Sequence, residues 1–542
     1  MGRSSRWLGG AAGAAAILGA VYALQAAAPS TSAAGERWWA HVRFLADDRL
    51  EGRLTGSEGY RQAAEYVAGK LQEYGLGPAG TNGYFQPVRF VVQRVVAAES
   101  SLRLVRGARA EPLALGEDAV LSSRLPQPQA IEAPLAFVGY ALHLPESGYD
   151  DFARQDLKGK VVVYINGGPG NVAGPLKSHA RAGQELYRAL EQTGAIGAIS
   201  IPNPKSMDIP WPRLSLAASQ PGMWLADPDL QDTRKPLFTA TFNPAHAEKL
   251  FGGSGHTFWE MLVLASAGKP MPRFPLAASL RARIAARTEQ VESSNVVGVL
   301  AGSDPKLAGE YVVLSAHLDH LGVGEPINGD RIYNGAMDNA SGVAALIEIA
   351  RAIQESGHRP RRSVLFLTPC GEEKGLLGSR YFAGHPTVSP AALVANLNID
   401  MFLPLHPLRY LLVLGLDESS LGDDVRSVAA AEGVEVVPDR FPDRNLFVRS
   451  DQYSFIRKGV PALAFAFGAA PGSPEEKLHQ EWLAHRYHAP SDDLNQPVDL
   501  AAAARFNQLM LRLTERVADD DLRPAWKQGS FFRRFAPAGG GS

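Results

Sequence analysis

The sequence has little cysteine and little net charge. Cys370 is the only cysteine among 542 residues, so no disulfide can form within the chain. It precedes an acidic pair that opposes thiolate formation, so we interpret it as a buried packing residue and not as a nucleophile. The formal net charge of −2 leaves no basic field that would gather a nucleic acid, and we expect no nucleic-acid partner.

The sequence also lacks a His-Glu-x-x-His motif, which argues against a zincin protease. Beyond the N-terminus, no segment has the length and apolarity of a membrane span. The charge-free run Leu8–Ala28 follows Arg3 and Arg6 and leads into small residues. This pattern predicts an export signal cleaved near Ala28 or Ala34, and hence a periplasmic or secreted protein. If the run stays uncleaved, it would instead anchor the chain in a membrane.

Length and local composition divide the chain into segments. Residues 1–34 form the export segment, and residues 35–110 include helical apolar spacing in GYRQAAEYVAGKLQEYGL. Residues 111–290 contain short apolar runs separated by Pro and Gly, which is typical of a β-rich inserted domain. Residues 291–525 alternate strands with helices and predict an α/β domain with a mostly parallel sheet. Residues 526–542 end in PAGGGS and predict a flexible tail.

Side chains that bind metals recur at the ends of the predicted strands. His317 follows the run YVVLSA, Glu373 follows SVLFLT after a short turn, and Asp400 ends the run ANLNI. Asp338 lies in the loop NGAMDNASG before a helix, and His488 lies in the polar loop RYHAPSDD. Ligands of open α/β sheets bind at the carboxyl edge of the strands, so we expect these five side chains to meet there.

These residue types suit two zinc ions. Zinc takes imidazole nitrogen and carboxylate oxygen, and two ions about 3.5–4 Å apart need a bridging ligand with two donor atoms. Asp338 is the predicted bridge. His317 and Asp400 would then hold one ion, and His488 and Glu373 the other. The sequence therefore predicts two Zn²⁺ ions per chain, at a site whose nitrogen and oxygen ligands also admit cobalt or manganese.

Two further carboxylates have predicted supporting roles. Glu372, beside the ligand Glu373, is the predicted general base that takes a proton from the attacking water. Asp319, two residues after His317, is predicted to accept the other ring N–H of that histidine and to fix its tautomer. The remaining histidines near these motifs are interpreted as pocket, surface or packing residues: His320, His385 and His485.

Six motifs, in order, resemble the motif series of metallopeptidase family 28: SAHLDHLG, YNGAMDNASG, GEEKGLLGS, NLNIDM, RSDQYSFIRKGVPAL and RYHAPSDD. That family includes aminopeptidase Y, bacterial leucyl aminopeptidases and glutamate carboxypeptidase. The resemblance covers residues 294–517, with a further piece in LADDRLEGRLTGSEGYRQAAEYVAGKL. It implies a three-layer α/β/α zinc-exopeptidase domain with a mixed, mostly parallel sheet, the same five ligands and Glu372 as base. The inserted stretch resembles a protease-associated domain in DLKGKVVVYINGG and AIGAISIPNP.

The chain departs from the family pattern on the substrate side. Similar sequences usually read Ser-Asp-His where this chain has Ser-Asp-Gln, ending at Gln452. Several members also place a tyrosine two or three residues before that motif to stabilise the oxyanion, where this chain has Phe447 and Val448. Neither side chain donates a hydrogen bond, so the oxyanion is left to the metal or to another donor such as Tyr453. One such donor is worth about 10²–10³-fold in rate.

Together these features predict an aminopeptidase that attacks peptide substrates with a hydroxide held between two ions, with Glu372 as the base. The same site would serve a carboxypeptidase or dipeptidase, and a basic subsite for the substrate carboxylate would be the sign of either. A catalytically weak peptide-binding relative is the second alternative, although such relatives usually lack a ligand or the base. Glutaminyl cyclases share the fold but use one zinc, so the complete set of five ligands argues against that class. Membrane contact is expected only with an uncleaved N-terminus, and the sequence carries no signal for an oligomeric state.

Overall fold

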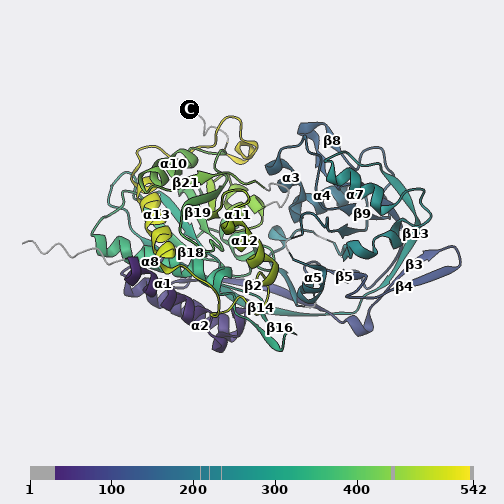
Figure 1. Ribbon diagram of the computed structural model, residues 1–542, viewed down its shortest axis with the longest axis horizontal. Coiled ribbons are helices and arrows are strands. Elements are labelled where there is room, and N and C mark those ends of the chain that lie inside the picture. Colours follow the sequence, from purple (N-terminus) through teal and green to yellow (C-terminus); the bar gives the residue numbers. More distant parts are fainter. Residues whose placement is uncertain (1–30, 208, 219, 234, 441–445, 538–542) are drawn as a thin grey trace, which may run out of the picture.

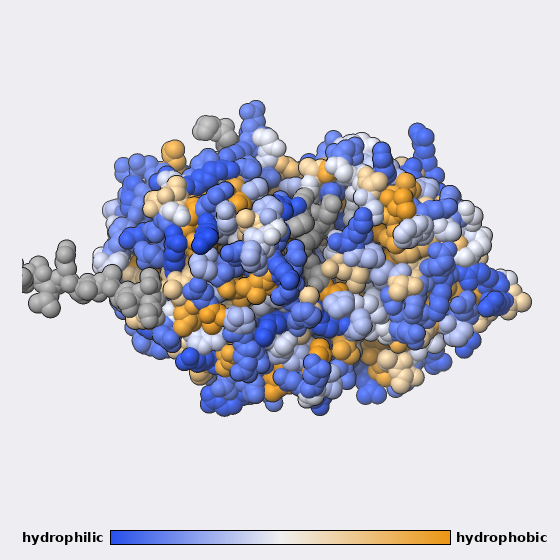
Figure 2. Space-filling model, viewed as in Figure 1, coloured by the Kyte–Doolittle hydropathy of each residue, from blue (hydrophilic) through white to orange (hydrophobic). Residues whose placement is uncertain are grey.

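The computed structural model describes residues 31–207, 209–218, 220–233, 235–440 and 446–537, which form two lobes (Figure 1). The predicted export segment, residues 1–34, lies almost wholly outside the described residues. None of the described helices is long and apolar enough to cross a membrane. The face shown in Figure 2 is mainly hydrophilic, and its hydrophobic residues form small separate patches.

The first lobe is built on a ten-stranded mixed sheet. Its strands, in spatial order, are β11 (Gly222–Leu225), β2 (Phe85–Val95), β14 (Ala286–Leu300), β18 (Ser363–Thr368), β15 (Tyr311–Ser315), β19 (Leu393–Ile399), β22 (Ala462–Gly468), β20 (Tyr410–Leu414) and β21 (Glu435–Val437), with β1 (Gly77–Pro78) beside β14. The predicted mixed α/β fold is confirmed. The parallel part is narrower than predicted, because the central strands β18, β15, β19 and β22 run parallel and antiparallel pairs flank them, with one further parallel pair, β20 and β21, at the edge.

Helices cover both faces of this sheet, which explains why its central strands are apolar throughout. In β15, Val312 and Leu314 join one hydrophobic core, whereas Val313 joins another, because successive side chains point to opposite faces. The first core lies under α1 (Thr31–Leu45), α2 (Glu58–Glu73), α8 (Ser341–Ser356), α10 (Leu421–Ala431) and α13 (Leu500–Asp519). The second lies under α9 (Leu377–Gly384) and α11 (Gln452–Ile456).

The second lobe has an eight-stranded sheet with a core of its own. In spatial order its strands are β4 (Arg109–Leu113), β3 (Ser101–Arg106), β13 (Phe274–Arg283), β6 (Ala130–Phe137), β9 (Val161–Ile165), β10 (Gly197–Ile201), β12 (Phe238–Phe242) and β5 (Ala119–Leu121). The prediction placed a β-rich domain at 111–290, whereas this sheet begins at Ser101. The run SLRLV, residues 101–105, fell within the predicted segment 35–110, since its alternation alone does not reveal which sheet it joins.

Two long strands join the lobes. β2 and β14 pair without interruption from Phe85 and Val296 to Val95 and Ala286, and they lead the chain into the second lobe and out again (Figure 1). β11, which comes from the chain of the second lobe, adds to the free edge of β2. The second lobe is therefore held beside the first by sheet hydrogen bonds as well as by the chain itself.

Part of the predicted tail packs against the first lobe. Trp526 and Phe532 are buried, and Phe532 lies edge-on to Phe447 with ring centroids 5.1 Å apart. The short helix Phe531–Phe535 carries Phe532. The expectation of a flexible tail at 526–542 came from the polar and glycine-rich end, and it overlooked how much apolar area three phenylalanines bury.

Candidate metal centre

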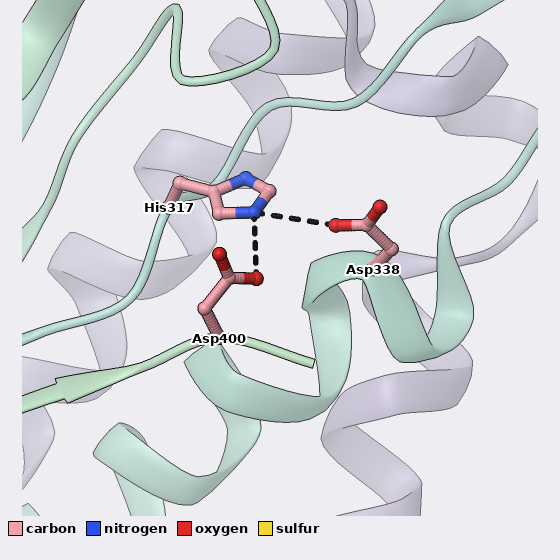
Figure 3. A group of neighbouring side chains, drawn as sticks. All are labelled: His317, Asp338 and Asp400. Carbon is pink, nitrogen blue, oxygen red and sulfur yellow. Dashed lines mark hydrogen bonds and ion pairs between the residues drawn. The ribbon is translucent and has the colours of Figure 1, made fainter. Parts of the chain in front are cut away.

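Three of the predicted ligands converge at the carboxyl edge of the central strands (Figure 3). His317 lies two residues beyond β15, Asp400 directly follows β19, and Asp338 lies in the turn Ala336–Ala340 before α8. The Nε2 atom of His317 is 3.3 Å from Asp338 Oδ1 and 3.2 Å from Asp400 Oδ1. One imidazole nitrogen therefore faces one oxygen from each of two carboxylates.

The other oxygen of Asp338 faces a second group of the same kind. His488 Nε2 lies 3.3 Å from Asp338 Oδ2 and 3.2 Å from Glu373 Oε2. The structure thus brings all five predicted ligands into one cluster. Asp338 stands between two histidines and presents one oxygen to each, which is the geometry that a bridging carboxylate requires.

The donor set fits divalent cations. Asp338 and Glu373 are buried, and Glu372 and Asp400 lie in the same cluster, so four carboxylates repel one another in a poorly solvated space. Donor atoms of His317, Asp338 and Asp400 lie within 4.8 Å of one another, as do those of His320, Asp338 and Glu373. Imidazole and carboxylate ligands at this density suit zinc and similar ions.

His320 offers a possible alternative to His488 at the second position. Its Nδ1 is 2.8 Å from Glu373 Oε1 but 4.0 Å from Asp338 Oδ2, whereas His488 is near both carboxylates. Within the described part of the chain, neither ring nitrogen of His320 makes a well-aligned hydrogen bond, and Glu373 Oε1 has none. His320 therefore lies against a ligand, and His488 has the better geometry for a shared ion.

Glu372 lies at the rim of the cluster, and Asp319 lies beneath it. Glu372 Oε2 is 4.0 Å from His317 Nε2, and burial raises the pKa of Glu372 well above its usual value. Asp319 Oδ1 accepts the main-chain N–H of Glu372 at 3.0 Å, and its Oδ2 accepts that of Glu373 at 3.4 Å. Asp319 thus holds the turn that carries the acidic pair.

The predicted contact between Asp319 and the His317 ring differs in detail. His317 Nδ1 lies 3.0 Å from the main-chain carbonyl oxygen of Asp319 and 3.9 Å from its carboxylate. The carbonyl, not the carboxylate, is therefore placed to accept the Nδ1–H of the neutral ring and leave Nε2 free for a metal. The carboxylate is occupied by the two N–H groups of the following turn.

Two residues that sequence reasoning missed fix the loops that carry the ligands. The guanidinium of Arg53 is fully buried and donates to the main-chain oxygens of Leu45, Leu318, Asn334 and Gly335. Asp492 accepts the N–H groups of Met337 at 2.9 Å and Asp338 at 3.0 Å. Both residues lie in segments that carried the family resemblance, and this was the available signal.

Comparison with known proteins bears on this site. Residues 295–514, which contain all five clustered ligands, match the sequence profile of peptidase family M28. The chain therefore contains a family M28 peptidase domain. Over 92% of its length, the chain also resembles a solved aminopeptidase from Aneurinibacillus sp. strain AM-1, with a TM-score of 0.53, 18% identity and 95% of that chain covered. At this identity, the likeness concerns the fold.

Curated proteins similar to the M28 domain differ in the activity that their names state. Mouse aminopeptidase NAALADL1 is 30% identical over 163 residues, which are 28% of this chain and 20% of the mouse protein. Leupeptin-inactivating enzyme 1 of Streptomyces exfoliatus is 26% identical over 38% of this chain and 44% of its own length. Human carboxypeptidase Q is 24% identical over 66% of this chain and 63% of its own. The chain spans less than two thirds of each of these relatives.

The contacts of Tyr453 differ from the expectation that this residue donates to an oxyanion. The Tyr453 hydroxyl lies 2.7 Å from Nδ1 of His179, which belongs to the second lobe, and it accepts from Arg457. Gln452 donates to the main-chain oxygen of Phe447 and accepts from Asn398. These side chains are engaged in lobe contacts and in support of β19, so they are not aimed at the cluster.

Tyr487 is better placed, and sequence reasoning missed it. Its ring lies against that of His488, with centroids 3.9 Å apart, and Arg449 Nη2 is 3.5 Å from its hydroxyl. Burial raises the pKa of Tyr487 well above its usual value, and nearby Asp338 adds to this rise, so the hydroxyl keeps its proton. Its position directly before His488 in RYHAPSDD was the signal in the sequence.

A cavity of about 830 Å³ between the lobes opens onto the M28 centre. Asp338, Glu372, Glu373, Asp400 and His488 line its inner end. Apolar side chains of the first lobe form part of its wall: Leu403, Leu414, Leu446, Val448, Phe465 and Leu483. A volume of this size lies within the usual range of ligand-binding pockets.

Proposed function

We propose that this protein is a two-zinc aminopeptidase, which removes N-terminal residues from peptides. The observation that carries the proposal is Asp338, which presents one oxygen to His317 at 3.3 Å and the other to His488 at 3.3 Å. His317 and Asp400 would hold one ion and His488 and Glu373 the other, with Asp338 shared. When bound, such a pair of ions polarises the peptide carbonyl and lowers the pKa of water.

Glu372 is the general base in this proposal. It lines the cavity at the rim of the cluster, where its carboxylate takes a proton from the attacking water and returns it to the leaving amine. Asp319 positions it by accepting the main-chain N–H of the same residue.

Tyr487 is the proposed donor to the oxyanion. Its protonated hydroxyl lines the cavity beside His488, where it replaces the hydrogen bond that Phe447 and Val448 cannot make. A single donor of this kind is worth about 10²–10³-fold in rate. Asp400, whose side chain is 19% exposed, is the most accessible carboxylate of the cluster and is proposed to receive the substrate's α-ammonium group.

The aminopeptidase proposal is tested with matched substrates. Zinc-loaded protein should cleave leucine p-nitroanilide, and N-acetylation of that substrate should abolish cleavage. The Glu372→Gln variant should retain its metal and lose at least about 10²-fold in kcat, because proton transfer is worth about that much. Glu481→Gln, at a site 55% exposed on α12 (Pro474–His485), is the control and should match wild type. Equal cleavage of the acetylated substrate would contradict the aminopeptidase proposal.

Export and the identity of the second lobe complete the proposal. The charge-free run after Arg3 and Arg6 supports a cleaved export signal and a periplasmic or secreted protein. The β-rich composition of the second lobe and its place over the cavity support a protease-associated domain. N-terminal sequencing of the protein recovered from a periplasmic fraction should find a start near Ala28 or Ala34. A retained Met1 would indicate an anchor.

A further inference from the structure

The wall of the catalytic cavity carries two cations that lack an anionic partner. Lys374 directly follows the acidic pair Glu372–Glu373, is 5% exposed and lines the cavity. Arg124 reaches the same wall from the second lobe and donates from Nη2 to the main-chain oxygen of Glu373 at 2.8 Å. Among the described residues, no carboxylate lies within ion-pair distance of either cation, and the Lys374 ammonium makes no hydrogen bond.

Several other cations around the cavity are paired, whereas Lys374 is buried without a carboxylate partner. Arg380 contacts Asp232 at 2.6 Å, Arg457 contacts Glu185 at 2.8 Å, and Arg440 contacts Glu476 at 2.9 Å. The like charge of Arg124 repels that of Lys374, and Glu373 and Asp319 attract it. Burying a cation beside another without an anion is costly, unless a ligand supplies the anion.

We propose that Lys374 and Arg124 form a subsite for a carboxylate of the peptide substrate. The inference rests on the proposed peptidase function and adds a preference for substrates that carry a carboxylate near the scissile bond. A preference for a C-terminal carboxylate would mark a dipeptidase, and one for an acidic side chain would keep the aminopeptidase. A guanidinium uses one of its five N–H groups on Glu373 and keeps the others, and an ammonium adds three donors. This combination of donors suits a carboxylate, and both cations lie beside the ligand Glu373.

Two sources can supply this carboxylate. One is the C-terminus of a dipeptide, whose carboxylate is one residue from the cleaved bond. The other is an aspartate or glutamate side chain directly after that bond. Both present the same planar anion, so the subsite chemistry is shared and the substrates distinguish the source.

Binding to the Glu372→Gln protein loaded with zinc tests the subsite without turnover. Isothermal titration calorimetry with Leu-Ala and Leu-Ala-amide reports a C-terminal carboxylate, and Leu-Glu-amide against Leu-Gln-amide reports a side-chain carboxylate. We expect the acidic member of at least one pair to bind about 10- to 100-fold more tightly, the range expected of hydrogen bonds to a charged group. This preference should fall about tenfold or more in Lys374→Met and Arg124→Gln, and Lys374→Arg should restore part of it.

Lys458→Met is the matched control, because Lys458 is an exposed lysine that lines the same cavity. It should leave the preference as it is in the parent protein. Equal affinities within both pairs would overturn the subsite, as would a preference that survives in Lys374→Met and Arg124→Gln. An equal loss for acidic and neutral peptides would assign the two cations to charge balance of the carboxylate cluster, and would also overturn it.

The proposed peptidase function is assessed separately. Leucine p-nitroanilide carries no carboxylate, so its cleavage by wild-type protein tests the peptidase alone. Cleavage of that substrate together with equal peptide affinities would reject the subsite and keep the enzyme. A carboxylate preference in binding without any cleavage would keep the subsite and reject the enzyme.

Discussion

Asp338 is the residue on which both halves of the metal centre depend. Its two oxygens face different histidines, whereas Asp400 approaches only His317 and Glu373 Oε2 approaches only His488. Bound cations would offset the electrostatic cost of gathering so many carboxylates.

Removing the bridge should therefore differ from removing a ligand of one ion. Asp338→Ala should lose both metals, because each ion is left with two protein ligands, whereas Asp400→Ala should retain about one ion per chain. Plasma mass spectrometry after dialysis measures zinc per chain, and circular dichroism checks that both variants fold. Equal zinc contents in the two variants would contradict a bridging role for Asp338.

The sequence predicted the residues of this site better than their contacts. His317, Asp400 and Glu373 follow apolar runs, so local pattern and the rules of parallel sheets sufficed to bring them together. Which atom of Asp319 faces the His317 ring depends on the backbone path over three residues, which residue spacing does not determine. The engagement of the Tyr453 hydroxyl by His179 depends on a contact between lobes, which no local pattern reveals.

At the scale of elements, the ligand loops depend on a segment that is distant in the sequence. Arg53 lies between α1 and α2 and donates to the loops that follow β15 and precede α8. Burial lowers the pKa of Arg53 to about 10, but nearby carboxylates including Asp492 oppose this, and it stays charged at neutral pH. Arg53 therefore supports the cluster in two ways. It donates hydrogen bonds to the loops that carry the ligands, and its positive charge attracts the nearby carboxylates.

Arg53→Met should cost about 3–5 kcal/mol of unfolding free energy, since it leaves buried carbonyl oxygens without donors and buried carboxylates without a cation. Urea unfolding followed by tryptophan fluorescence measures this change. Arg49→Met is the control, because Arg49 is exposed and pairs only with Asp47. It should shift the free energy by less than about 0.5 kcal/mol. Similar losses in the two variants would refute the role assigned to Arg53.

Element boundaries were less predictable than the elements themselves. The strands β15, β18, β19 and β22 were recognisable because each is a buried apolar run. By contrast, β2 and β14 continue from the first lobe toward the second, so composition does not mark where one lobe ends. The aromatic segment Phe531–Phe535 was assigned to a flexible tail because its packing partner, Phe447, lies far away in the sequence.

At the scale of the whole molecule, His179 links the lobes. It belongs to the second lobe, contacts the Tyr453 hydroxyl of the first, and lies among the rings of Phe531 and Phe535. Burial is the main cause that lowers the pKa of His179 to about 4; the charges of Arg457 and Arg534 act in the same direction, and Glu185 and Glu146 oppose them. The folded protein therefore favours the neutral imidazole.

This shift predicts a loss of stability in acid. A histidine whose folded pKa lies below its unfolded value contributes its full stability above about pH 6.5, and loses it as the pH falls toward 4. The wild-type melting temperature should fall more between pH 7.5 and pH 5 than that of His179→Gln, which cannot be protonated. Differential scanning calorimetry at both pH values measures this difference. Parallel declines in the two proteins would exclude His179 as the source.

The central claim is that Asp338 bridges two zinc ions at the carboxyl edge of this sheet. The most direct test is a crystal structure of zinc-loaded protein, with anomalous diffraction recorded on both sides of the zinc absorption edge. The account predicts two anomalous peaks about 3.5–4 Å apart, one beside His317 and Asp400 and the other beside Glu373 and His488. A single peak, or a second ion held by His320 without His488, would contradict it.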